Sequence, residues 1–233
     1  MPFDIRPTRS GNTATAARPS YQSEIAQHSV LRNTYFLLSL TLLFSAFTAL
    51  IAMKTHAAPL HWLIQLVGMF GLLFLTMALR NSAWGVVSIF AFTGFIGYTL
   101  GPVLNAYLVE FTNGSQLIFT SLGATGVIFV ALSGYVLTTK KDFSFMGGFL
   151  FIAIIGAIML SLAGALFHLP MMQIAMSGAF VIIFSGYILY NTSQILHNGE
   201  TNYIMATITL YLDILNLFLS LLRILSYFAG NRD

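Results

Sequence analysis

The sequence predicts an all-α integral membrane protein, a bundle of seven transmembrane helices with the seventh helix central. Composition is the first reason, because 57% of the residues are hydrophobic, 7% are charged and the mean hydropathy is +0.83. So few polar side chains cannot cover a water-soluble globule. The second reason is a series of apolar stretches near the roughly 20 residues that cross a bilayer core. The third is a row of polar residues on the last stretch, a pattern typical of a helix facing a bundle interior.

Each predicted helix lies between charges or helix-breaking residues. The second begins at a proline and ends before Arg80, the fourth ends before Lys140 and Lys141, and the sixth follows Pro170. Because the connections are short, neighbouring helices are expected to pack antiparallel in one compact bundle. The predicted helices cover residues 34–53, 59–79, 84–109, 116–138, 143–169, 171–196 and 202–228.

Residues 1–30 are rich in Ser, Thr, Ala and Pro and contain no apolar core of the kind a signal peptide needs. We expect them to form a flexible cytoplasmic tail, with residues 31–233 as the transmembrane domain. The basic residues support this orientation, because seven fall on the tail side of the bundle and three on the other side. The positive-inside rule then places the N-terminus in the cytoplasm and the C-terminus outside. The two sets are Arg6, Arg9, Arg18, Arg32, Arg80, Lys140 and Lys141 against Lys54, Arg223 and Arg232.

The polar residues of the seventh helix share one face. Thr209, Asp213, Asn216, Ser220 and Arg223 follow one another at intervals of 4, 3, 4 and 3 residues. Thr, Asn and Ser can simply hold helices together by hydrogen bonds. A carboxyl group is a costly way to obtain that effect in a membrane, so Asp213 is the candidate functional residue, a proton or ion sensor.

Two residues outside this helix are candidate partners of Asp213. Asn191 lies on the sixth helix, and a few unwound residues around 198–201 would bring it level with Asp213. Arg80 ends the second helix on the same side and is the cation placed to neutralise the carboxylate, unless it only anchors the helix end at the membrane surface. Asp213, Asn191 and Arg80 are therefore the predicted ion-sensing or proton-sensing group.

The third helix carries Gly94, Gly97, Gly101 and Asn105 on one face, beside Pro102. Small residues at this spacing permit close helix packing, and the proline leaves a gating hinge as the alternative. Enzyme chemistry has little support, because the membrane interior supplies one carboxylate and no Ser–His pair at matching depth. No Cys is present and no His pair has ligand spacing with a carboxylate, so no metal site and no cofactor are expected.

Four blocks of the sequence resemble the Bax inhibitor-1 family, also called the transmembrane Bax inhibitor motif family. They are HSVLRNTYFLLSLTLLFSAFTA, AFTGFIGYTLGPVLN, YVLTTKKDFSFMGG and NGETNYIMATITLYLDILNLFLSLLRIL. The likeness extends from about residue 28 to the end and is greatest for the bacterial YccA-like branch, modulators of the membrane protease FtsH. It implies a seven-helix bundle with the last helix central.

The resemblance also implies site residues. Some bacterial members are pH-sensitive calcium leaks with an aspartate on each of the last two helices and an arginine latch on the second. The matching positions here are Asp213, Asn191 and Arg80, so the sixth-helix aspartate is replaced by an amide. The proton-sharing pair of carboxylates is then absent, which weakens the expectation of calcium selectivity.

Two functions therefore stand side by side. The leading one is an inner-membrane protein, not an enzyme, that binds and restrains FtsH while being itself a slow substrate. The alternative is a pH-sensitive Ca²⁺ or H⁺ leak along the polar stripe of the seventh helix. The expected partners are the FtsH complex and the lipid bilayer, and nucleic acid is not expected, because the basic residues are explained by membrane topology.

Overall fold

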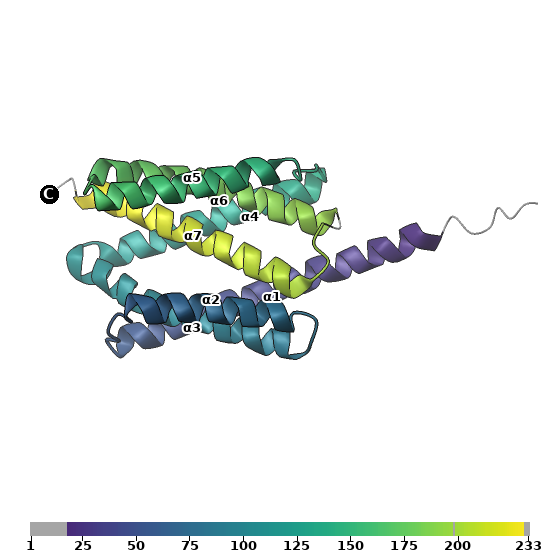
Figure 1. Ribbon diagram of the computed structural model, residues 1–233, viewed down its shortest axis with the longest axis horizontal. Helices are drawn as coiled ribbons and strands as arrows, with labels where there is room; N and C mark the ends of the chain where they lie inside the picture. The colour runs from purple at the N-terminus through teal and green to yellow at the C-terminus, as the bar shows by residue number, and fades with distance from the viewer. Residues whose placement is uncertain (1–17, 198, 231–233) are drawn as a thin grey trace, which may run out of the picture.

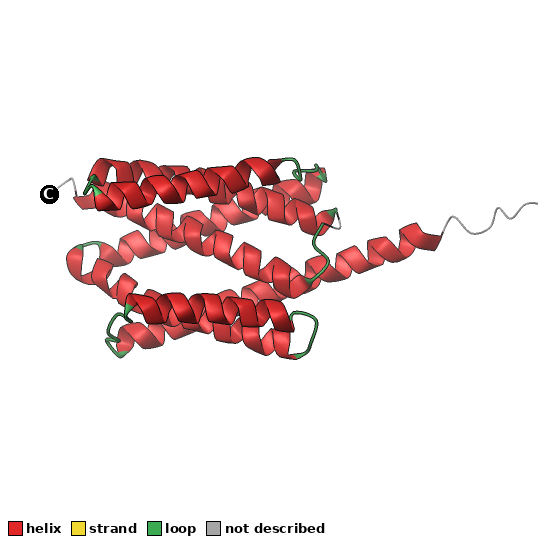
Figure 2. Ribbon diagram, viewed as in Figure 1, coloured by secondary structure: helices red, strands yellow, loops and turns green. Residues whose placement is uncertain are grey.

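A computed structural model describes the backbone of residues 18–197 and 199–230, and the side chains of that part except 18–28 and 170. Its regular structure there is entirely helical (Figures 1 and 2). Each helix contains a stretch long and apolar enough to span a membrane, which confirms the predicted all-α, seven-span fold. The helices are α1 (Arg18–Lys54), α2 (Trp62–Leu79), α3 (Trp84–Glu110), α4 (Gly114–Thr139), α5 (Met146–Leu166), α6 (Pro170–Leu196) and α7 (Tyr203–Gly230).

The ends of α2 to α7 lie within three residues of the predicted ends, and local chemistry explains several of them. Helix α4 stops where Lys140 adopts the left-handed conformation, with φ of 52°. Helix α7 starts after Asn202, whose Oδ1 accepts hydrogen bonds from the backbone N–H of Ile204 (3.0 Å) and Met205 (3.2 Å). This is the geometry of an N-cap, which satisfies donors that a helix start leaves unpaired.

Helix α1 is the exception, because it begins at Arg18 and not at residue 34. The segment predicted as a flexible tail is therefore helical from residue 18, whereas residues 1–17 lie outside the described part of the chain. The physical reason is that Pro19 falls in the first turn, where proline is tolerated, and no Gly or Pro follows before Pro59 to end the helix. The start of α1 projects beyond the end of the bundle (Figure 1).

The helices form two groups that α7 joins. Helices α1, α2 and α3 pack together, as do α4, α5 and α6, and α7 crosses between the groups at an angle (Figure 1). Helix α7 contacts α1 and α3 of one group and α4 and α6 of the other. Helix α3 also contacts helices of both groups, as does α6, so the structure does not single out α7 as the centre.

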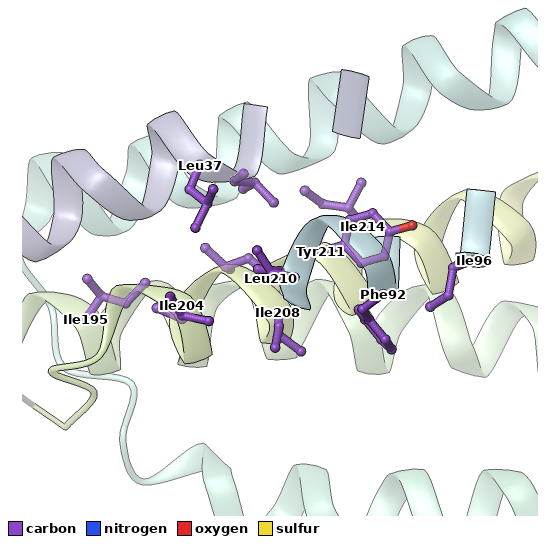
Figure 3. Packing of buried hydrophobic residues seen from close by; sticks show 12 residues of the cluster. Leu37, Phe92, Ile96, Ile195, Ile204, Ile208, Leu210, Tyr211 and Ile214 are labelled. Carbon is purple, nitrogen blue, oxygen red and sulfur yellow. The ribbon is translucent and has the colours of Figure 1, made fainter. Parts of the chain in front are cut away.

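The larger hydrophobic core lies along α7, where it meets α1 and α3. It includes Leu37 of α1, Phe92 of α3 and Tyr211 of α7, all buried (Figure 3). A second cluster lies where α3, α4 and α7 meet and includes Leu104 and Phe218. The buried side of α7 thus contains apolar side chains as well as polar ones. The spacing of the polar residues did not predict this apolar surface.

Glycines of α3 bring it close to α1. A Cβ added to Gly97 would overlap the carbonyl oxygen of Ser45, and one added to Gly101 would overlap the side chain of Ala52. Four residues further on, Asn105 Nδ2 donates a hydrogen bond to the carbonyl oxygen of Met53 (3.2 Å). These contacts confirm the packing interpretation of the glycine face, and α3 continues through Pro102 as one helix.

Candidate functional site

Asp213 lies in the middle of α7 with a side chain that is 5% exposed. Its Oδ2 accepts a hydrogen bond from Asn191 Nδ2 of α6 at 2.6 Å, a short distance for such a pair. The amide can donate to the carboxyl group without adding a charge, so the contact reduces the cost of burying a polar group between helices. The structure thus brings together two of the three predicted sensing residues.

Two features set the depth at which these side chains meet. Residues 197 and 199–202 lie outside the helices, so the connection spans part of the height that separates Asn191 from Asp213 along the chain. The Nδ2 of Asn202, the residue that caps α7, also donates to the carbonyl oxygen of Arg80 (3.0 Å) and to Asn81 Oδ1 (2.9 Å). The start of α7 is thereby fixed to the α2–α3 turn. Asp213 lies eleven residues after Asn202, close to three turns of helix, so this cap determines its height.

Arg80 does not join Asn191 and Asp213. Its side chain is exposed at the end of α2, and no ion pair links it to Asp213 in the part of the chain that the structure describes. The predicted neutralisation is therefore not present in this structure. The reason is helix adjacency, because α2 packs mainly against α3, so the exposed side chain at its end does not lie between α6 and α7. The backbone of Arg80, through its contact with Asn202, is the part that reaches α7.

The other members of the polar stripe bond within their own helix. Thr209 Oγ1 donates to the carbonyl oxygen of Ala206 (3.0 Å), Asn216 Nδ2 to that of Leu212 (2.8 Å), and Ser220 Oγ to that of Asn216 (2.7 Å). Arg223 is exposed. These three side chains donate to carbonyl oxygens of their own helix. Among the hydrogen bonds described for the stripe, the one that Asp213 accepts from Asn191 connects two helices.

A second polar contact of α7 was not predicted from the sequence. The hydroxyl of Tyr211 lies 2.8 Å from Ser45 Oγ of α1 and 3.4 Å from the carbonyl oxygen of Thr93 of α3. One turn earlier, Thr207 Oγ1 is 3.3 Å from the carbonyl oxygen of Thr34 and 2.7 Å from that of its own-helix neighbour Tyr203. The spacing of Thr207 and Tyr211, four residues apart, was the available signal, but both lie beside the stripe and not on it. Figure 3 shows Tyr211 among the apolar side chains of this interface.

A third cluster holds the α4–α5 connection to the end of α6. Ser193 Oγ accepts a hydrogen bond from the backbone N–H of Phe143 (2.8 Å) and donates one to Asp142 Oδ1 (3.3 Å). His197, the residue after α6, places Nε2 at 3.2 Å from the carbonyl oxygen of Lys140. Hydrogen bonds from the side chain and backbone of Ser144 lower the pKa of Asp142, which is exposed outside the membrane spans. This cluster fixes the end of the helix that carries Asn191.

The chemistry available to these residues is limited. Among the side chains that the structure describes, no three His, Asp or Glu residues are grouped as a metal site would require. Asp213 is a single carboxyl group with one amide donor, and its neighbours on the stripe are hydroxyl and amide groups. Such a group can bind or release a proton and can attract a cation.

Comparison with known proteins assigns the chain to a family. The family model described as inhibitor of apoptosis-promoting Bax1 matches residues 27–230, most of the 233 residues and the part that holds all seven spans. The chain belongs to the Bax inhibitor-1 family. The resemblance found in the sequence is thereby confirmed.

Curated bacterial relatives of this Bax inhibitor-1 family member are similar over nearly their whole length. An uncharacterized protein of Pseudomonas aeruginosa is 50% identical over 205 residues, covering 87% of this chain and 90% of the relative. The modulator of FtsH protease YccA of Escherichia coli K12 is 48% identical over 211 residues, covering 91% and 94%. An uncharacterized membrane protein of Vibrio cholerae is 44% identical over 213 residues, covering 91% and 95%.

These comparisons describe a regulatory membrane protein. The family description names an inhibitor, the E. coli K12 relative is named a protease modulator, and the same protein in another E. coli strain is named an inner membrane protein. None of these names describes an enzyme. Together with seven apolar helices, they identify this Bax inhibitor-1 family member as a multi-pass membrane protein.

Proposed function

We propose that this protein binds the membrane protease FtsH in the bacterial inner membrane and restrains it, while being itself a slow substrate. The observation that carries the proposal is the 48% identity to E. coli YccA, named modulator of FtsH protease, over 91% of the chain. That alignment is long enough to include most of the bundle, so similarity is not confined to one motif.

The start of the chain supports the substrate part of the proposal. A motor that extracts membrane proteins needs an end of the chain on its own side that it can engage. Helix α1 continues outside its membrane span, which begins at Ser29, and projects from the bundle (Figure 1). Residues 1–17 precede it and have the Ser, Thr and Pro content expected of a flexible grip.

The packing of α1 supports the proposal that FtsH degrades the protein slowly. Gly97 and Gly101 let α3 approach the backbone of α1, and α1 also contacts α6 and α7. Pulling α1 out of the bundle would break these contacts together with the hydrogen bond between Tyr211 and Ser45. A protease that binds the projecting end would therefore be occupied for longer than by a loosely packed substrate.

Deletion of residues 2–25 tests the proposal. The deletion removes the segment that FtsH is proposed to engage. It ends before Ser29, so the membrane contacts of the bundle remain. We expect FtsH to stop degrading the truncated protein, which should then inhibit degradation of a second membrane substrate for longer. A matched control replaces residues 2–25 with a Gly/Ser linker of equal length, which should restore degradation if only a flexible end is needed. Equal lifetimes of all three forms, with and without active FtsH, would refute the proposal.

The proposed orientation has the N-terminus in the cytoplasm and the C-terminus in the periplasm, and it can be tested separately. The chain has no native Cys, so single cysteines can be labelled without background. Substitutions Ser10→Cys, Lys141→Cys and Asn198→Cys should react only from the cytoplasmic side, and Gly230→Cys only from the outside. Labelling of Lys141→Cys and Gly230→Cys from the same face would contradict it.

A second candidate function is a pH-sensitive leak of H⁺ or Ca²⁺. The observation that favours it is the buried Asp213, a carboxyl group in the middle of α7 that contacts Asn191 of α6. Flux into liposomes that contain only this protein would separate the two functions, because a pure protease modulator leaves the membrane tight. If Asp213 is the sensor, Asp213→Asn should abolish pH dependence and Asn191→Asp should increase Ca²⁺ passage. Unchanged pH dependence in Asp213→Asn would eliminate Asp213 as the sensor.

A further inference from the structure

A cavity of about 610 Å³ lies between α1, α3, α4 and α7, away from the Asp213 contact. Its inner wall is buried, because Leu104, Tyr211 and Phe218 are each at most 7% exposed. Its outer edge is formed by Leu50 of α1 and Phe119 of α4, which are 53% and 74% exposed. The cavity therefore opens sideways between α1 and α4, toward the hydrocarbon of the bilayer.

The buried polar side chains in the wall are already paired, and the remaining one, Ser115, is exposed. Ser45 Oγ and the Tyr211 hydroxyl lie 2.8 Å apart, and Thr125 Oγ1 donates to the carbonyl oxygen of Ser121 at 2.7 Å. Ordered water needs two to four polar partners, which this wall does not supply. An empty space of this size is also unfavourable, because the cost of a cavity grows with its volume. The occupant is thus an apolar group.

The size of the cavity selects between two apolar occupants. A helix is about 10 Å wide with its side chains, so 610 Å³ would hold only about one and a half turns of it. A lipid chain is much narrower, and lipid chains already surround the opening in the membrane. The volume and the sideways opening therefore fit a lipid chain and not a partner helix.

Two charged residues that fit a headgroup follow lining residues at the ends of α1 and α3. Lys54 ends α1 directly after the lining residue Met53, and Glu110 ends α3 two residues after the lining residue Leu108. Both charged side chains are exposed, and the hydrogen bond from Asn105 to Met53 holds these two helix ends together. A cation and an anion at these two helix ends match a phosphate and an ammonium group.

We propose that this cavity binds one acyl chain of a zwitterionic phospholipid that carries a phosphate and an amine. The chain lies against Tyr211 and Phe218, and the headgroup lies beside Lys54 and Glu110. This site is independent of the proposed action on FtsH, because it rests on the shape and charge of the bundle alone.

The test uses the purified full-length protein with phosphatidylethanolamine that carries a photoreactive diazirine on one acyl chain. Peptides of α1, α4 and α7 that line the cavity should be labelled, and unlabelled phosphatidylethanolamine should compete at least threefold better than diacylglycerol with the same chains. Gly126→Phe should reduce this labelling at least fivefold, because Gly126 lines the cavity and an added Cβ meets no atom within 4 Å.

Gly123→Phe is the matched control. Gly123 is also an exposed glycine of α4 with no atom within 4 Å of an added Cβ, but it does not line the cavity, so labelling should stay unchanged. Ala46→Phe fills the cavity from α1 and serves if Gly126→Phe does not fold. Equal labelling of both glycine variants would overturn the site, and equal competition by diacylglycerol would overturn the headgroup. Cross-links from these peptides to a second protein in native membranes would assign the cavity to a partner helix and overturn the proposal.

Discussion

The two sides of α7 bury polar side chains with different kinds of hydrogen-bond partner. Toward α6, the buried Asp213 has an amide as its partner, at 2.6 Å. Toward α1 and α3, the Tyr211 hydroxyl lies between a serine hydroxyl and a backbone carbonyl. Neutral hydroxyl groups are inexpensive to bury when they are bonded, whereas a carboxyl group with few donors is not. The α1 side thus serves packing, and the contrast supports the proposal that the α6 side carries an ionisable group for proton or ion sensing.

The largest expected effect comes from Asn191→Leu, which leaves Asp213 buried without its donor. We expect the free energy of unfolding to fall by about 2 to 4 kcal/mol. The double variant Asn191→Leu with Asp213→Leu should recover at least half of this loss, because both polar groups are then removed. Denaturant unfolding of the four proteins in one detergent measures the coupling. A double variant less stable than Asn191→Leu would show that the contact is not the source of the loss.

A smaller effect is expected on the other side of α7. Tyr211→Phe removes one hydroxyl from a bonded neutral network and should reduce the free energy of unfolding by about 1 kcal/mol. Tyr98→Phe is the control, since Tyr98 is 38% exposed on α3. The same unfolding measurement applies, and a loss from Tyr211→Phe as large as that from Asn191→Leu would erase the contrast between the two sides.

A third experiment examines the end of α6 and depends on pH. The pKa of Asp142 is lowered in the folded protein by its hydrogen bonds with Ser144. A carboxylate with a lowered pKa stabilises the fold above its unfolded pKa of about 3.9, and this contribution is lost as pH falls through the folded pKa. Asp142→Asn should therefore be less stable than the parent protein at pH 7, and this difference should be smaller at pH 2. A stability gap of the same size at both pH values would contradict the assignment.

The smallest effect is expected from Arg80→Gln. The Arg80 side chain is exposed, and its backbone carbonyl, which the substitution keeps, makes the contact with Asn202. The unfolding free energy should change by less than about 0.5 kcal/mol. A loss comparable to that of Asn191→Leu would mean that the guanidinium reaches the α6 side of α7 after all.

Hydropathy predicted the ends of α2 to α7 well because most of them lie near a charge or a helix-breaking residue, as at Lys140 and Pro170. The depth match of Asn191 and Asp213 was also predictable, since a hairpin fixes the relative heights of its two helices. The exposed position of the Arg80 side chain was not predictable, because the sequence shows that α2 ends on the same side but not which helices lie beside α6 and α7. Tyr211 was missed since its partners, Ser45 and Thr93, lie on helices far away in the sequence.

The length of α1 has a mechanical consequence. Its 37 residues make a rod of about 55 Å, longer than the bilayer with its headgroups, so its first turns stand clear of the membrane surface. A force applied to that end acts along the rod, in line with the row of contacts that Gly97 and Gly101 make with α1. Such a load shears the whole interface at once, whereas a sideways force would peel it one contact at a time. Helix α1 is thus oriented so that pulling on its projecting end meets the full strength of the bundle.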